Sequence, residues 1–214
     1  MSPESINSVK DVKSIEFESE RLKAAYDLAY KSHEGQVRKS GEPYFTHCFE
    51  VYKILKDEWG VTDENFLIAG LLHDTVEDTG VSLKKIQLDF GDEVANLVSG
   101  VTKLETNTDQ ETLKKVLNKT YINPGVAIIM LADRLHNMRT LEFMKPKKQI
   151  EKSRETLDVY TRLAESLGMW NVKTELEDWC FKYLDPNNWQ KTSVGLAKDQ
   201  RLSLNFSGYL KSRL

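Results

Sequence analysis

The chain has 214 residues, 40% of them hydrophobic, and this length and composition are enough to bury one sizeable core. Its formal net charge is −3. Its longest apolar run, VAIIMLA at 126–132, is far shorter than the roughly 20 residues that a membrane span requires. The acidic balance argues against a nucleic-acid partner, so we expect neither nucleic acid nor a membrane to be bound.

The cysteines and the N-terminal sequence indicate the compartment. Cys48 and Cys180 lie in separate apolar segments without CxxC spacing, which favours two reduced, buried thiols over a disulfide. The first twenty residues contain no apolar signal region. We therefore expect a cytoplasmic protein.

Apolar residues recur at helical spacing in the first half of the chain, and no sustained period-two run appears. The pattern is carried by Leu22, Ala25, Tyr26 and Ala29, then by Phe49, Val51, Ile54 and Leu55, and then by Phe66, Leu67, Ala69 and Leu71. Small polar residues able to cap the following helices are Thr62 or Asp63, then Ser82, then Asp92. These features predict a succession of helices.

The second half continues this pattern. Helices are expected at 124–143, 147–167 and 172–184, with Pro124 in a first turn and Gly168 as a left-handed C-cap. Loops are expected at 34–45 and 104–109. We predict an all-α fold in which a single domain, 20–186, lies between an N-terminal extension, 1–19, and a helical or extended C-terminal tail, 187–214.

The segment GLLHDTVEDTG, residues 70–80, concentrates four metal-capable side chains. Positions four apart share a helix face, so His73 is expected over Glu77, and Asp74 over Asp78. Three carboxylates this close would repel one another if buried alone, whereas a divalent cation would keep them ionised. The preceding AGLL favours a buried helix, and with it a metal site, over a solvated helix face.

Further ligands are available elsewhere in the chain. His47 lies at the start of the second helix, and Asp133 interrupts the apolar run AIIMLADRL, where a buried carboxylate without a partner would cost several kcal/mol. With Asn137 and Thr140, spaced four and three residues further on, Asp133 forms a polar stripe that is expected to line a site. For Asn137 and Thr140, plain surface polarity is an equally good interpretation.

The loop GQVRKSGEP supplies positive charge shortly before His47. Arg38, Lys39 and Ser40 offer a guanidinium, an ammonium group and a hydroxyl, although such a loop is more often only solvated. The other two histidines, His33 and His136, are expected to be structural.

Four of these segments resemble a known family. HEGQVRKSGEPYFTH, LLHDTVEDT, FGDEVANLVSGVTKL and LADRLHNMRTLE are similar to the hydrolase domain of the RelA/SpoT homologues, HD-domain metal phosphohydrolases that degrade the alarmones ppGpp and pppGpp. The similarity continues to YLDP and covers about residues 20–186. It implies that this domain is an HD-domain helical bundle.

The resemblance also implies site residues and a reaction. It implies one Mn²⁺ per chain, although Zn²⁺ or Fe²⁺ generally binds such ligands more tightly. The reaction would remove the 3′-pyrophosphate of (p)ppGpp, giving GDP or GTP and pyrophosphate. The implied metal ligands are His47, His73, Asp74 and Asp133, the catalytic carboxylates Glu77 and Asp78, and the nucleotide contacts Arg38, Lys39, Ser40, Asn137 and Thr140.

Length and substrate leave alternatives open. Full-length RelA/SpoT homologues continue into a synthetase, whereas this sequence ends about 30 residues after YLDP, so it resembles a small alarmone hydrolase, with a truncated longer enzyme as the lesser alternative. Any switching is expected to come from homo-oligomerisation, metal supply or transcription. The alternative functions are the same chemistry on (p)ppApp or on the 2′-phosphate of NADPH, and a silent alarmone-binding module.

Overall fold

The computed structural model describes residues 17–102 and 123–192. Over these ranges the chain forms helices and turns without any β-strand, which confirms the all-α prediction. The expected N-terminal extension up to residue 16, the loop at 104–109 and the tail beyond residue 192 lie outside the described residues. No described helix is both long and apolar enough to cross a membrane.

The described residues belong to two compact units. The first comprises residues 17–36 and 43–102, and the second comprises residues 37–42 and 123–192. The short segment 37–42 therefore belongs to the second unit although both of its neighbours in sequence belong to the first.

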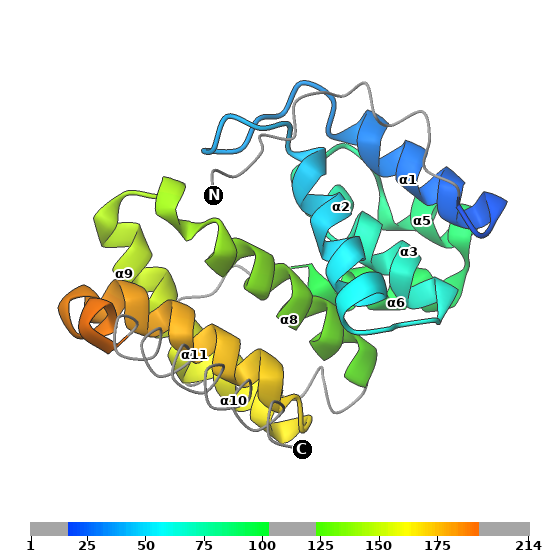
Figure 1. Cartoon of the computed structure of the whole chain (residues 1–214). Helices are drawn as coiled ribbons and strands as arrows, with labels where there is room; N and C mark the ends of the chain where they lie inside the picture. The colour runs from blue at the N-terminus through cyan, green and yellow to red at the C-terminus, as the bar shows by residue number, and fades with distance from the viewer. Residues whose placement is uncertain (1–16, 103–122, 193–214) are drawn as a thin grey trace, which may run out of the picture. The chain divides into compact units, whose positions relative to one another are not determined.

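The first unit is built around α3 (Figure 1). This helix is apolar on nearly all sides, and its last six residues are buried because α1, α2 and α6 pack against it. The helices of this unit are α1 (Glu20–Ser32), α2 (Phe45–Lys53), η2 (Ile54–Glu58), α3 (Glu64–Leu72), α4 (Thr75–Asp78), α5 (Leu83–Phe90) and α6 (Asp92–Val101).

Side-chain caps fix where several of these helices begin. The carboxylate of Asp63 accepts a hydrogen bond from the backbone N–H of Asn65 at 2.8 Å, and Ser82 caps α5 in the same way. Both caps were predicted. The prediction of Asp92 as a cap was wrong by one residue: Gly91, at φ +92°, is the N-cap, and Asp92 begins α6.

Gly70 lies where α3 meets η2, and its lack of a side chain is required there. A Cβ added at Gly70 would lie 2.5 Å from Cδ1 of Leu55, which is fully buried. We expect Gly70→Ala to lower the free energy of unfolding by about 1 kcal/mol, since overpacking costs about 2 kcal/mol and a gain in helix propensity offsets about 1 kcal/mol of it. Urea denaturation measures this change.

Gly80→Ala is the matched control, because a Cβ at Gly80 would meet no atom within 4 Å and its φ is not positive. Equal stability of the two variants would contradict the close approach of α3 and η2.

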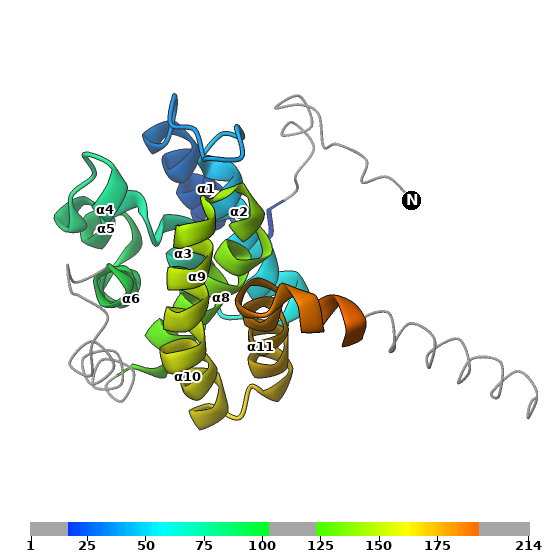
Figure 2. The same ribbon diagram turned by 90° about the vertical axis from the view of Figure 1, so that its left-hand side faces the viewer.

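The second unit contains α8 (Pro124–Arg139), η3 (Leu141–Phe143), α9 (Pro146–Glu155), η4 (Thr156–Tyr160), α10 (Thr161–Ser166) and α11 (Trp170–Leu184), followed by a helix over residues 186–192. Figure 2 shows α10 and α11 as a hairpin, and α11 also packs against α8 and α9. Asn123 caps α8. Pro124 occupies the first turn of this helix, as predicted.

Two helix predictions in this unit need correction. The helix expected to reach residue 143 ends at Arg139 and is followed by the short 3₁₀ turn η3. The helix expected over 147–167 is interrupted by the π-helical turn η4. The sequence did not predict this turn, because apolar spacing does not distinguish i→i+5 from i→i+4 hydrogen bonding. Gly168 ends this run at φ +70°, as predicted.

Candidate metal centre

The HD pair lies in the turn between two helices. The sequence predicted one helix through residues 70–80, but α3 ends at Leu72, and His73 and Asp74 join it to the four-residue helix α4. The backbone N–H of Asp78 still donates to the carbonyl of Asp74 at 2.8 Å. Asp74 and Asp78 are therefore still one helical turn apart, as predicted, although the helix is interrupted after Leu72.

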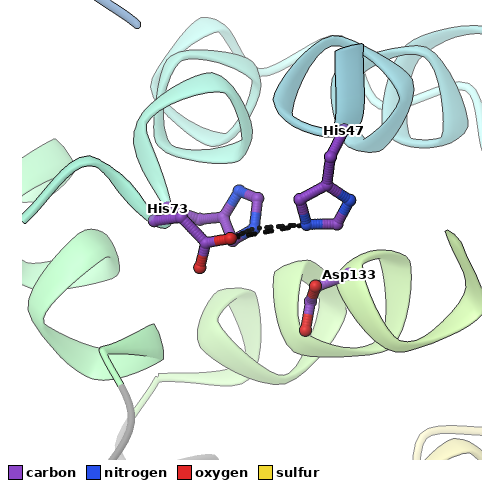
Figure 3. Close-up of side chains that lie close together, drawn as sticks. His47, His73 and Asp133 are labelled. Carbon is purple, nitrogen blue, oxygen red and sulfur yellow. Dashed lines mark hydrogen bonds and ion pairs between the residues drawn. The ribbon is translucent and has the colours of Figure 1, made fainter. Parts of the chain in front are cut away.

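Two imidazoles and a carboxylate converge at this turn. Nε2 of His47 lies 3.2 Å from Nε2 of His73, and Oδ2 of Asp74 lies 3.4 Å and 3.1 Å from these two nitrogens. Figure 3 shows the imidazole of His47, from α2, directed at that of His73. All three residues are at most 4% exposed. Three potential ligand atoms thus meet at one buried point.

The spacing of these atoms fits a metal ion. Ligand atoms about 2.0–2.2 Å from one ion lie about 3–3.5 Å from one another in tetrahedral or octahedral arrangements. Nδ1 of His73 lies 2.9 Å from the carbonyl oxygen of Gly70 and donates to it, which leaves the lone pair of Nε2 directed at the other two ligands. His47, His73 and Asp74 could therefore hold a divalent cation.

Tyr44 joins the metal-ligand carboxylate to the next acidic residue. Its hydroxyl lies 2.7 Å from Oδ2 of Asp74 and 2.7 Å from Oδ2 of Asp78. Burial and the neighbouring charge of Asp74 raise the pKa of Tyr44, so the phenol stays a donor. A phenol has one proton to donate, and a cation at Asp74 would relieve the remaining repulsion between the two carboxylates.

Tyr44 was not among the sequence-predicted site residues. It stands in the quoted segment GEPYFTH, but an aromatic residue just before a helix is more often part of the core. Its partners are 30 and 34 residues away in the sequence, so only the fold reveals them.

The two predicted catalytic carboxylates belong to α4. Glu77 and Asp78 are both exposed, in contrast to the buried ligand trio. Exposure leaves both carboxylates accessible to water and to a substrate, as an acid–base group requires.

In the second unit, the predicted loop and stripe residues meet one another. Nη2 of Arg38 donates to Oδ1 of Asn137 at 2.7 Å, and Nδ2 of Asn137 donates to Oδ1 of Asp133 at 2.6 Å. Nη1 of Arg38 lies 3.0 Å from Nδ1 of His136. Asp133, labelled in Figure 3, is 5% exposed, which confirms its predicted burial. His136 is thus part of the surroundings of Arg38, a role that its position off the stripe had not suggested.

The other three predicted nucleotide contacts are Lys39, Ser40 and Thr140. Lys39 is exposed and Ser40 is half-buried, both in the turn that the 2.9 Å hydrogen bond from Gly41 N to Arg38 O closes. The hydroxyl of Thr140 donates to the carbonyl of His136 in its own helix at 3.0 Å. The structure therefore brings the side chain of Arg38 to that of Asn137, whereas the hydroxyl of Thr140 lies 3.5 Å from the backbone carbonyl of Asn137.

A buried ion pair anchors α8 next to Asp133. Nη2 of Arg134 donates to Oε1 of Glu155 at 2.8 Å, and its guanidinium carbon lies 3.9 Å from the ring centre of Tyr160. Burial opposes the charged form, but Tyr160 and Glu155 outweigh it and raise the pKa of Arg134. Arg134 therefore stays charged and fixes α8 against α9 and η4.

Residues 25–170 match the family described as the HD domain, a range that spans most of both units. Because this match covers more than half of the chain, the protein belongs to the HD-domain family. Its relatives include proteins described as a GTP pyrophosphokinase and as a guanosine-3′,5′-bis(diphosphate) 3′-pyrophosphohydrolase, and a structural neighbour is described as an ortholog of SpoT, which confirms the resemblance to the RelA/SpoT homologues.

Two relatives and one solved structure illustrate this. The chain is 46% identical over 175 residues to a probable GTP pyrophosphokinase of Mycobacterium leprae, covering 79% of this chain and 22% of that protein. It is 40% identical over 190 residues to a guanosine-3′,5′-bis(diphosphate) 3′-pyrophosphohydrolase of Aquifex aeolicus, covering 87% and 27%. The chain thus spans about a quarter of the length of these curated relatives.

The solved structure is that of a metazoan ortholog of SpoT described as hydrolysing ppGpp and playing a role in starvation responses. It superposes with a TM-score of 0.63 at 27% identity, covering 80% of this chain and 99% of that one. The fold described above is therefore similar to that of a ppGpp hydrolase over nearly the whole length of the latter.

Proposed function

We propose that this protein is a metal-dependent (p)ppGpp 3′-pyrophosphohydrolase that converts ppGpp and water into GDP and pyrophosphate. The observation that carries the proposal is the buried convergence of His47, His73 and Asp74 at 3.1–3.4 Å in a chain of the HD-domain family. Relatives and a structural neighbour described as ppGpp hydrolases support the choice of substrate.

Asp133 is proposed as the fourth ligand. Its carboxylate offers the anionic oxygen that divalent cations bind. Because Asp133 is buried in the apolar helix α8, its charge is not simply solvated by water and requires a partner. Mn²⁺ is the proposed ion, since two imidazoles and two carboxylates with room for water suit a six-coordinate, borderline-hard cation.

The chemical step requires an activated water and a base. When bound, the ion would lower the pKa of water and orient a phosphoryl oxygen. Glu77 and Asp78 are the proposed acid–base pair: they lie on α4, immediately after the ligand Asp74, and both are exposed. One of them accepts the proton of the attacking water while the bond between the 3′-oxygen and the pyrophosphate breaks.

Nucleotide contacts are proposed for the loop and the stripe. The guanidinium of Arg38 is planar and suited to stacking on a base, and its bonds to Asn137 and His136 hold it at α8. Lys39 and Ser40 would add charge and a hydroxyl for the phosphates, and Asn137 and Thr140 would contact the ribose or its phosphates. Cys48 and Cys180 are buried thiols that form no disulfide, which supports action in the cytoplasm.

A panel of nucleotides tests the proposal. Purified protein is incubated with Mn²⁺ and ppGpp, ppApp or NADPH, and the products are separated by anion-exchange chromatography. We expect GDP and pyrophosphate from ppGpp. Turnover of only ppApp or NADPH would move the same chemistry to another substrate, and turnover of none, with ppGpp still bound, would identify an alarmone-binding module.

A further inference from the structure

We propose that Tyr44 is a positioning residue that holds the carboxylates of Asp74 and Asp78 in their working orientations, supported by His33 and Gln36. Tyr44 and the two residues that support it, His33 and Gln36, form a cluster at this end of the first unit. The inference rests on the proposed function, which gives the two carboxylates their roles as metal ligand and acid–base group.

The hydroxyl of Tyr44 contacts the two carboxylates through one oxygen atom of each. Both distances are 2.7 Å, to Oδ2 of Asp74 and to Oδ2 of Asp78. The single phenolic proton is donated to one of these oxygens at a time, and the carboxylate that accepts it cannot rotate about its own terminal bond without losing the hydrogen bond. The phenol therefore fixes which oxygen of Asp74 stands beside His47 and His73, since Oδ2 is also the oxygen near both imidazoles.

Tyr44 is itself held on two sides. Its ring stacks on the imidazole of His33, with centroids 4.9 Å apart and planes at 16°, and meets the ring of His47 nearly at right angles at 5.9 Å. Its backbone carbonyl accepts from the N–H of His47 at 2.9 Å. One residue thus contacts two proposed ligands, His47 and Asp74.

Gln36 fixes the backbone of the same acidic segment. Its Nε2 donates to the carbonyl of Asp78 at 2.8 Å, so its Oε1 is the acceptor that lies 2.8 Å from Nδ1 of His33. The N–H of Tyr44 donates to the carbonyl of Gln36 at 2.9 Å, which closes the cluster. Gln36, in the segment that follows α1, thereby ties that segment to the last residue of α4.

Tyr44→Phe tests the proposal, because it removes the hydroxyl and keeps the ring on His33. We expect affinity for Mn²⁺, measured by calorimetry on the chelator-treated full chain, to fall about 10-fold or more, and kcat for ppGpp at saturating Mn²⁺ to fall about 10- to 100-fold. KM should change little, since the hydroxyl faces carboxylates. Circular dichroism melting verifies that the variant folds.

Tyr30→Phe is the matched control. It makes the same chemical change on a neighbouring, partly exposed tyrosine, whose ring also packs on an aromatic neighbour, Phe45, at 5.3 Å. This control should keep both the Mn²⁺ affinity and kcat of the wild type.

A double-mutant cycle separates the two carboxylates. If Tyr44 affects turnover through Asp78, Tyr44→Phe should cost little further kcat at saturating Mn²⁺ in the Asp78→Asn background. Its effect on Mn²⁺ affinity, exerted through Asp74, should persist there. A merely structural role would instead lower kcat equally in both backgrounds.

The outcomes distinguish this proposal from the proposed function. If the wild type hydrolyses ppGpp and Tyr44→Phe retains its kcat and Mn²⁺ affinity, the positioning role is overturned and the function stands. If the wild type binds Mn²⁺ without turnover, the loss of affinity in Tyr44→Phe still supports the positioning of Asp74. A wild type that binds no Mn²⁺ would overturn both.

Discussion

Asp74→Asn is expected to remove the bound metal and the activity together. The substitution keeps the size of the side chain but removes the negative charge that lies 3.1 Å and 3.4 Å from the two imidazole nitrogens. A bound metal supplies several kcal/mol of transition-state stabilisation. Since each 1.4 kcal/mol is a factor of ten in rate, kcat should fall about 10²- to 10³-fold. Metal content after dialysis, measured by mass spectrometry of the eluted ion, gives the independent readout.

Asp89→Asn is the control for this experiment, because Asp89 carries an exposed ion pair with Lys85 on α5. It should retain both metal and turnover. Unchanged metal content in Asp74→Asn would refute the assignment of Asp74 as a ligand.

Glu77→Gln is expected to separate metal binding from chemistry. Glu77 is exposed on α4 and is not one of the buried residues His47, His73 and Asp74 whose ligand atoms converge, so its neutralisation should leave the metal in place. A positioned acid–base group contributes about 10²–10⁴-fold, so kcat should fall at least about 10²-fold. Single-turnover kinetics at saturating Mn²⁺ would measure this loss directly.

Glu50→Gln provides the matched control, since Glu50 forms a surface ion pair with Lys53 on α2. Near-wild-type kinetics in Glu77→Gln would exclude Glu77 from the chemistry and leave Asp78 as the remaining base. Loss of the metal in Glu77→Gln would instead indicate that Glu77 is a ligand.

The sequence predicted most of the helices because their signals are local. Apolar spacing marks the buried face of α1, and Asp63 and Ser82 cap the helices that they precede. The π-helical turns η2 and η4 were missed, since they leave the apolar pattern nearly continuous. The break after Leu72 was also missed. No Gly or Pro marks it in the sequence, and His73 and Asp74 both keep α-region backbone angles.

Residue chemistry was enough to predict which ligand types could meet at a site, whereas the contacts that depend on the fold could not be predicted. The pairing of the HD dipeptide with His47 followed from ligand types, and the structure brings these three residues together. Arg38 and His136 are 98 residues apart in the sequence, so no local sequence pattern predicts their contact. Tyr44 was missed for the same reason.

The central claim is that a metal held by the HD residues drives hydrolysis of the 3′-pyrophosphate. The most direct measurement follows the ³¹P NMR spectrum of ppGpp with chelator-treated protein before and after addition of Mn²⁺. We predict no reaction before addition and equal amounts of GDP and pyrophosphate after it. Equal turnover without metal, or release of orthophosphate in place of pyrophosphate, would contradict the claim.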